Sequence, residues 1–347
     1  MAVYTTIDDS GLYFNTKLYT GTGSSLANTG VGFQPDWVWI KGRSGATEHV
    51  LTDSVRGVTK ELSSDDTGAE ETVAQGLTAF GSDGFTVGTD GSYNTSSATY
   101  TSWNWKAGTT SGIVTNASTD ITPSAYSFNQ TAGFNVFKFT GAGNSGDTVA
   151  HGLGAIPEFI IIKVTGTTHG WITYHGALGG TKNLNLETSN GAATAISRWN
   201  NTNPDSVNIT LGNSNNVNGA STEYICYAFS GKQGYSKFGE YTGNGNANGT
   251  FVFLGFKPAF LMCKRTDDAS EWSMFDNKRN TFNVVNHHVY ADLPNAEGDD
   301  DDLDFTANGF KFRRDAGNTN GSGATYIYAA FAEAPFVNSN GVPCNAR

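Results

Sequence analysis

The chain has 347 residues, a formal net charge of −11 and only 15% charged residues, with 43 glycines, 22 phenylalanines, 14 tyrosines and 7 tryptophans. Binding to phosphate backbones needs clustered cations, so 21 lysines and arginines against 32 acidic residues argue against a nucleic-acid partner. No apolar run reaches the roughly 20 residues that cross a membrane, and the first residues lack the basic and apolar regions of a signal peptide. We therefore expect a protein made in the cytoplasm, with no membrane partner.

The composition predicts an all-β protein. β-branched and aromatic residues are plentiful, strong helix formers are scarce, and glycine, asparagine and serine supply many turns. No apolar period of 3.6 residues is sustained over three helical turns, so helical turns are expected only between Ala192 and Trp199.

Three stretches of the chain begin alike, with an aromatic strand that stops at a threonine followed by a glycine-rich turn. These threonines are Thr20, Thr140 and Thr242. Because aromatic runs bounded by glycine are typical of strands, each stretch is expected to open with one. The pattern indicates an internal repeat.

A proline element follows each opening strand. It has a glycine three residues before the proline, an aromatic residue two after it, and a lysine six after it. The prolines are Pro35, Pro157 and Pro258, and the lysines are Lys41, Lys163 and Lys264. Proline cannot donate to a strand ladder and belongs at a strand start, which predicts strands at residues 36–41, 158–163 and 259–264.

A second strand is expected to return from each proline strand through a short hairpin. Eight residues after the lysine stands a large ring, and four residues further on stands a polar residue. The rings are His49, Trp171 and Trp272, and the polar residues are Asp53, His175 and Asp276. Asp53 and Arg56 are expected to form an ion pair beside a turn.

Each repeat closes with a polar loop and an aromatic strand that begins near Tyr100, Tyr224 or Tyr326. We therefore predict three tandem antiparallel β-sandwich, jelly-roll-like repeats: 1–107, 130–231 and 232–336. A Thr/Ser-rich segment, 108–129, is expected to be a linker or a covering segment, and 337–347 a C-terminal tail. Alternatively, two adjacent repeats merge into one larger jelly-roll or lectin-like sandwich, since only residues 231–234 join the last two.

The cysteines predict neither a disulfide framework nor a structural zinc site. Cys226, Cys263 and Cys344 are odd in number and widely spaced. Cys226 and Cys263 stand in apolar strand runs, where a free cysteine behaves as a small hydrophobic residue.

The acidic run is the one candidate for a hard cation. Asp299, Asp300, Asp301 and Asp302 offer the oxygen ligands that Ca²⁺ prefers. The spacing is not that of an EF-hand, and a run of like charges is usually a solvated loop, which we favour. The pairs His287/His288 and His169/His175 lack further ligands at metal-binding spacing. We expect no catalytic residues and no cofactor.

Polar loops before the closing strands are the candidate binding surfaces, because loops on a rigid scaffold commonly carry binding residues. Plain connecting turns are the alternative. The residues singled out are Tyr93, Asn94, Asn215, Asn216, Asn318 and Asn320.

Three motifs give the chain a resemblance to a known family. They are Gly255-Phe256-Lys257-Pro258-Ala259-Phe260 with its lysine, residues 235–245, and residues 330–343. Together they resemble the repeat-built virion proteins of marine tailed bacteriophages, over nearly the whole chain and most strongly in the third repeat. The resemblance implies a homo-oligomeric virion component of the tail or fibre type, without carrying over any catalytic residue. The first repeat departs from the pattern at Trp103-Asn104-Trp105, which points to a specialised role for it.

Three functions follow as hypotheses. The first is a virion structural protein in a tail fibre or appendage, made in the host cytoplasm, with other virion proteins and a host-surface glycan or protein as partners. The second is a capsid-decorating or head-fibre protein. The third is a polysaccharide-degrading tailspike enzyme, which would need two carboxyl groups flanking the scissile bond. Asp53 and Asp276 occupy equivalent places, but the sequence pairs neither of them with a second carboxyl group.

Overall fold

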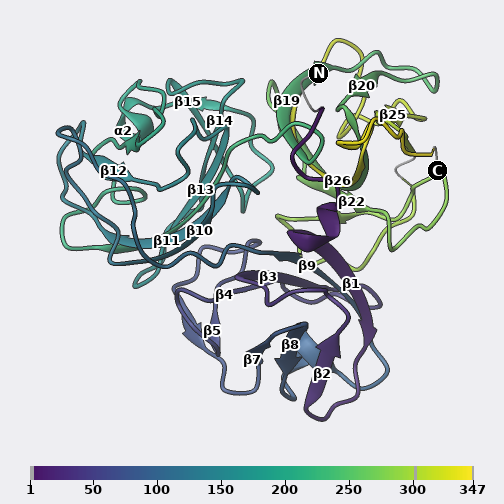
Figure 1. Cartoon of the computed structure of the whole chain (residues 1–347), viewed down its shortest axis with the longest axis horizontal. Coiled ribbons are helices and arrows are strands. Elements are labelled where there is room, and N and C mark those ends of the chain that lie inside the picture. Colours follow the sequence, from purple (N-terminus) through teal and green to yellow (C-terminus); the bar gives the residue numbers. More distant parts are fainter. Residues whose placement is uncertain (1–3, 301–302, 346–347) are drawn as a thin grey trace.

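The computed structural model describes residues 4–300 and 303–345 and is nearly all β, with 40% of residues in strands and 3% in helices. Three lobes surround a common centre (Figure 1). Pairings between named strands in the described residues are all antiparallel, and none of the sheets closes into a barrel. The all-β prediction is confirmed.

Lobe one (residues 10–105) contains a main sheet and a smaller sheet. The main sheet runs β1 (Phe14–Thr20), β9 (Thr99–Trp105), β3 (Trp37–Gly42), β4 (Val50–Asp53). The smaller sheet runs β2 (Leu26–Thr29), β8 (Gly84–Val87), β7 (Leu77–Gly81). The remaining elements are the 3-10 turn η1 (Ser10–Leu12), the pair β5 (Lys60–Glu61) and β6 (Glu71–Thr72), and α1 (Gly91–Asn94).

Lobe two (residues 125–229) has the widest sheet. It runs β10 (Ala125–Asn129), β11 (Phe134–Thr140), β18 (Glu223–Phe229), β13 (Phe159–Val164), β14 (Ile172–His175), β15 (Lys182–Asn185), β16 (Ala193–Thr194). Its smaller sheet pairs β12 (Thr148–Ala150) with β17 (Asn208–Thr210), and α2 (Ile196–Trp199) is a single turn.

Lobe three (residues 236–335) again has two sheets. The main sheet runs β19 (Ser236–Thr242), β26 (Thr325–Pro335), β21 (Phe256–Arg265), β22 (Ser273–Asp276), β23 (Val289–Tyr290). The smaller sheet runs β20 (Phe251–Phe253), β25 (Gly309–Phe312), β24 (Leu303–Thr306).

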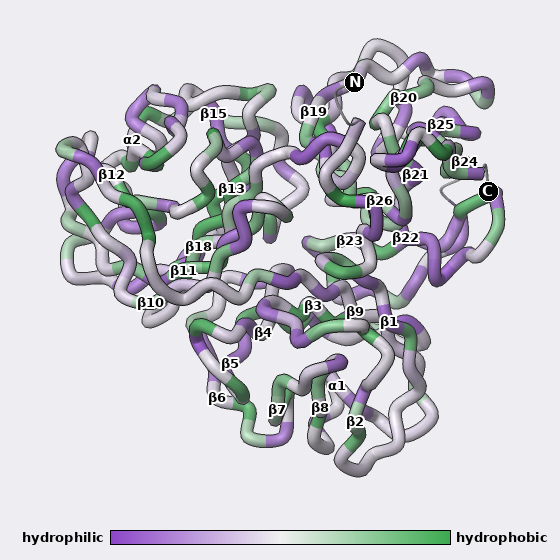
Figure 2. Tube along the Cα trace, in the orientation of Figure 1, coloured by the Kyte–Doolittle hydropathy of each residue, from purple (hydrophilic) through white to green (hydrophobic). Residues whose placement is uncertain are grey.

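Each main sheet is buried on both faces, which explains its nearly continuous apolar strands. In β3, Val38 and Ile40 pack against residues of the smaller sheet of lobe one. Trp37 and Trp39 alternate with them and belong to a second cluster at the centre of the molecule. Hydrophobic segments accordingly follow the main strands, and hydrophilic ones the outer loops (Figure 2).

The central cluster draws its residues from all three lobes. The ring centroids of Trp37 and Tyr227 lie 4.3 Å apart across lobes one and two. Phe331 of lobe three lies 5.6 Å from Trp105 and 5.6 Å from Phe229. Buried aromatic rings dominate core energetics, so this cluster ties the lobes into one body.

The expected strands are present as β3, β13 and β21, and the returning strands as β4, β14 and β22. Pro258 lies inside β21 rather than before it, at a shift in register with β26 that accommodates its missing N–H. Residues 125–129, which the sequence places in a linker, form β10 of the lobe-two main sheet. The expected turn near Trp199 is α2, and no helix in the described ranges is long and apolar enough to span a membrane.

Candidate functional site

A buried ion pair lies at the end of β22. The Arg279 Nε atom is 2.6 Å from Asp276 Oδ2, and both side chains are inaccessible to solvent. The indole N–H of Trp103 in lobe one donates to the same oxygen over 3.1 Å. Burial alone would raise the pKa of Asp276, but Arg279 and donated hydrogen bonds outweigh it and lower that pKa. The carboxylate therefore joins two lobes as a stable anion.

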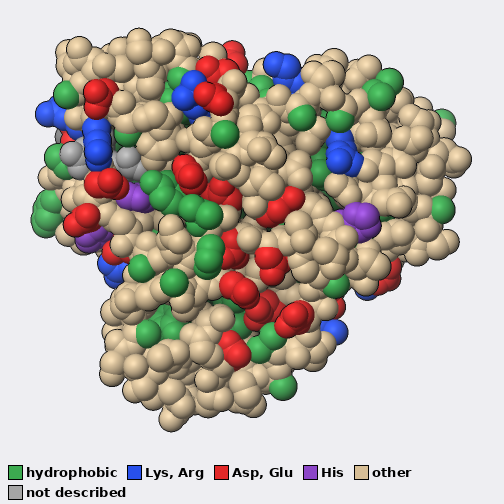
Figure 3. Space-filling view, turned by 180° about the vertical axis from the view of Figure 1, so that it is seen from behind, with side chains coloured by type: hydrophobic (Ala, Val, Ile, Leu, Met, Phe, Trp, Pro, Cys, Tyr) green, Lys and Arg blue, Asp and Glu red, His purple; other side chains and the backbone are tan. Residues whose placement is uncertain are grey.

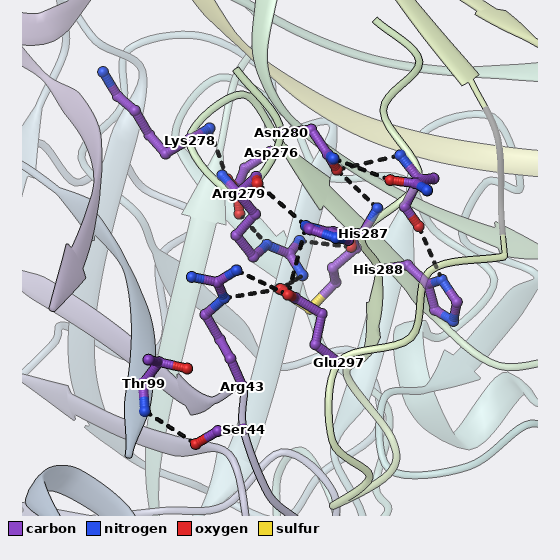
Figure 4. A network of polar contacts seen from close by, with 12 residues as sticks. Arg43, Ser44, Thr99, Asp276, Lys278, Arg279, Asn280, His287, His288 and Glu297 are labelled. Carbon is purple, nitrogen blue, oxygen red and sulfur yellow. Dashed lines mark hydrogen bonds and ion pairs between the residues drawn. The ribbon is translucent and has the colours of Figure 1, made fainter. Parts of the chain in front are cut away.

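The network continues through Glu297 (Figure 4). Its carboxylate accepts two hydrogen bonds from Arg43 of lobe one, at 2.8 and 2.9 Å, and lies 3.4 Å from Arg279. His287 Nδ1 lies 3.5 Å from the same carboxylate. Bidentate pairing of this kind fixes geometry, so Glu297 clamps lobe three to lobe one.

Lobe one carries the counterpart of this pair, and the expected Asp53–Arg56 ion pair is confirmed at 2.5 Å. The Tyr227 hydroxyl of lobe two donates to Asp53 over 2.8 Å. In lobe two the equivalent residue is His175, whose Nε2 lies 3.1 Å from the Tyr328 carbonyl oxygen of lobe three. Burial lowers the pKa of His175 to about 4. These polar groups therefore hold lobes together and do not face solvent.

The repeated lysine makes a similar contact in every lobe. Each lysine is fully buried, and its ammonium donates to a backbone carbonyl of another lobe. The pairs are Lys41 with Pro294 (3.0 Å), Lys163 with Gly68 (2.7 Å) and Lys264 with Ser189 (2.8 Å). Lobe one thus contacts lobe three, lobe two contacts lobe one, and lobe three contacts lobe two, closing a ring.

The ring residue of each returning strand donates across the same interfaces. The contacts are Trp171 Nε1 to Ser63 O (2.8 Å), Trp272 Nε1 to Asn185 O (3.0 Å) and His49 Nε2 to Tyr290 O (2.8 Å). The indole of Trp39 donates to His49 Nδ1, so a neutral His49 carries its proton on Nε2. The sequence spacing predicts the positions of these three rings, but it does not predict which carbonyl of another lobe each ring contacts.

The lysines predict an unusual dependence of stability on pH. Burial lowers the pKa of Lys41, Lys163 and Lys264 from 10.5 to about 8. Below pH 8 both the folded and the unfolded state hold these protons. From pH 8 upward the folded state releases protons that the unfolded state still binds, so stability should rise with pH. We expect the melting temperature to increase from pH 8 to about 9, and Lys163→Met to weaken that increase; a fall in both proteins would contradict this.

The loop residues proposed for surface binding divide into two groups. Tyr93, Asn94 and Asn320 are at most 1% exposed, which corrects the expectation of a surface role for their side chains. Asn320 Oδ1 accepts from the Asn244 N–H, and its Nδ2 donates to the Arg314 carbonyl, so it holds its loop together.

The remaining loop candidates lie nearer the surface. Asn215 is exposed, and Asn216 and Asn318 are half-buried. Asn216 Oδ1 lies 2.8 Å from His169 Nδ1, and Asn318 Nδ2 contacts the Tyr290 hydroxyl at 3.3 Å. A surface-binding role for these three stays a prediction.

Replacing Asn320 with alanine is expected to lower the free energy of unfolding by about 1–3 kcal/mol, because buried backbone groups would lose their partners. Asn215→Ala is the matched control, since this exposed side chain should contribute within about 0.5 kcal/mol. Urea titration followed by tryptophan fluorescence measures both. Equal effects would contradict the structural role of Asn320.

The acidic run lies partly outside the described residues, which exclude Asp301 and Asp302. Asp299 and Asp300 are exposed; Asp300 Oδ2 lies 3.5 Å from Arg314, and its Oδ1 lies 3.7 Å from His288. Within residues 4–300 and 303–345, no group of three or more histidine, cysteine or acidic side chains is placed to hold a metal ion. A Ca²⁺ site stays an untested alternative. Cys226 and Cys263 are buried, as expected of small hydrophobic residues.

Comparison with known proteins gives one match. No curated protein and no solved structure matches the chain. A family model described as a domain of unknown function, DUF7483, matches residues 9–335, which include the strands of all three lobes. The chain therefore belongs to the DUF7483 family.

Proposed function

We propose that the chain is a structural protein of a tailed-phage virion, in a tail fibre or other appendage that contacts the host surface. The observation that carries the proposal is that the buried charged side chains contact other lobes rather than solvent. Asp53, Asp276 and the three repeated lysines contact other lobes, as a rigid scaffold requires, and the loops remain to meet partners. The resemblance to phage virion proteins gives the setting. The proposal assigns the chain no catalytic role.

We also propose that the lobes are three copies of one sandwich-like unit, with boundaries near residues 107, 130 and 232. Each main sheet contains the same order of four strands: opening, closing, proline and returning. These are β1-β9-β3-β4, β11-β18-β13-β14 and β19-β26-β21-β22. Thr20, Thr140 and Thr242 each pair with the residue before the closing tyrosine, which supports a common register.

The surface charge supports protein or glycan partners rather than nucleic acid. Acidic side chains gather where the lobes meet on the face shown in Figure 3, with few cations among them. Such a field repels phosphate backbones. Other virion proteins and a host-surface glycan or protein are the proposed partners, and a homo-oligomer is the proposed assembly.

Mapping the protein on purified particles tests the proposal. Mass spectrometry of virions from a phage that encodes this chain should detect it, and immunogold labelling should place it at the tail. Gold spread over the head would favour the capsid-decorating alternative, and absence from the particle would refute both. Release of reducing ends from host capsule by the purified protein would instead support the tailspike enzyme.

A further inference from the structure

Residues 119–129, at the start of lobe two, cover one edge of each of the two sheets of that lobe. β10 pairs with β11 along its whole length, from Ala125 opposite Lys138 to Asn129 opposite Phe134. Ile121 forms a bridge with Val149 of β12 and is only 8% exposed. Unpaired strand edges are sites for strand addition, and here the chain fills its own edges.

In lobe three, no strand of the described residues pairs with β19 on the side away from β26. Only residues 230–235 separate β18 from β19, which is too short a connection to add a strand. β19 is one of the two edge strands of its main sheet, and β20 is one of the two edge strands of its smaller sheet. The described chain therefore leaves beside β19 the position that β10 fills in lobe two.

A groove of about 620 Å³ lies at this position. It is lined by β19 residues 236–240, by Leu254, and by Gly176-Ala177 of lobe two. Counting back from the paired threonines Thr140 and Thr242, residues 236–240 correspond to residues 134–138. Those are the β11 residues that pair with β10. The groove is thus the counterpart of an occupied strand site.

Backbone N–H and C=O groups of β19 point toward this groove. Ser236 exchanges two backbone hydrogen bonds with Lys232, at 2.9 and 3.1 Å, on the side away from β26. Because backbone groups alternate along an antiparallel strand, Phe238 and Glu240 direct their N–H and C=O groups to that same side. In lobe two the matching carbonyl, that of Lys138, accepts from the Ser124 N–H over 2.8 Å.

The side chains of the groove carry no net charge. The charged residues that line it are two lysines, Lys232 and Lys237, and two carboxylates, Glu158 and Glu240. Burial lowers the pKa of both lysines, and burial raises the pKa of Glu158. A ligand with many charges of one sign gains nothing here, whereas an uncharged polar and aromatic segment like that of β10 fits.

We propose that this groove binds an extended, uncharged segment of another polypeptide, which adds as an antiparallel strand beside Phe238–Glu240. Gly176-Ala177 of lobe two and residues 231–233 also line the groove, so its occupant must lie between these residues and β19, as an extended segment can. Segment 119–129 is already seated in lobe two, and the tail folds back through a hydrogen bond from the Cys344 N–H to the Phe336 carbonyl. The inference uses the correspondence of the lobes proposed above, but it does not depend on the virion role.

The test uses the sequence of the covering segment itself as the probe. A fluorescein-labelled peptide of residues 123–130 is titrated with the full chain, and anisotropy reports binding. Glu240→Pro removes an N–H that faces the groove and leaves the bonds to β26 intact, so binding should weaken by about tenfold or more. Glu240→Ala keeps that N–H and should bind within about twofold of the unmodified chain. Ala177→Trp, which places a large side chain in the groove from lobe two, should also weaken binding.

Circular dichroism and melting temperature establish that each variant is folded. No peptide binding at millimolar concentration, or equal binding by Glu240→Pro and Glu240→Ala, would overturn the proposal. Self-association of the chain that Glu240→Pro abolishes, without peptide binding, would overturn the choice of occupant and assign the edge to a second copy.

Discussion

Replacing Asp276 with alanine is expected to lower the free energy of unfolding by about 3–5 kcal/mol, among the largest effects of any single substitution. The carboxylate is the partner of a guanidinium that water does not reach, and it also accepts from the Trp103 indole. Without it, Arg279 remains charged and buried, with only the more distant Glu297 to compensate. Chemical denaturation followed by fluorescence measures the loss.

The matched control is Asp267→Ala, which removes the carboxylate of an exposed pair with Arg265. That pair has the same chemistry and a similar separation, 2.9 Å, but both side chains are partly in water. Exposed pairs contribute about 0–1 kcal/mol, so this variant should be nearly as stable as the unmodified chain. If both substitutions cost the same, the buried network does not join the lobes in the way we describe.

The strands were predictable because their signals are local. The glycine, proline and lysine spacing locates each strand, which starts just after Pro35 and Pro157 but contains Pro258, and apolar residues mark the strand itself. Three copies of one pattern strengthen each prediction, since a chance match would not recur with the same spacing. That residues 125–129 form a strand was not predictable, because β10 owes its pairing to β11, which lies beyond it in the chain.

The contacts between lobes were not predictable, because they depend on how distant segments assemble. A lysine six residues after a proline gives no sign that it will be buried against a carbonyl of another lobe, as Lys163 is against Gly68. Asn94 and Asn320 read as exposed loop residues, since asparagine is common in turns. Their burial follows from side-chain hydrogen bonds to the loop backbone, which sequence spacing does not reveal.

The groove beside β19 was not predictable from the sequence for the same reason: it depends on how distant segments of the chain assemble. The short junction at residues 231–234 suggests from sequence only that the last two repeats could merge into one sandwich. Its second consequence appears only beside lobe two, where a longer junction supplies β10. Comparison with β10 in lobe two is what shows that a strand position beside β19 is left open by the described residues.

Replacing Phe331 with alanine is expected to lower the free energy of unfolding by about 3–5 kcal/mol through the cavity left at the centre. The ring is buried among aromatic rings of all three lobes, with Phe14 at 5.2 Å, Phe229 at 5.6 Å and Phe260 at 6.2 Å. Because no lobe has this cluster to itself, the loss should shift a single cooperative transition. Calorimetry with fluorescence and circular dichroism as parallel probes measures it.

Phe282→Ala is the control for Phe331→Ala, since this phenylalanine is 77% exposed and should contribute within about 0.5 kcal/mol. Separate transitions, of which only one moved in Phe331→Ala, would mean that each lobe has an independent core. In that case the shared aromatic centre would be a contact surface between three stable units. A single shifted transition would make the centre a condition for the folding of each lobe.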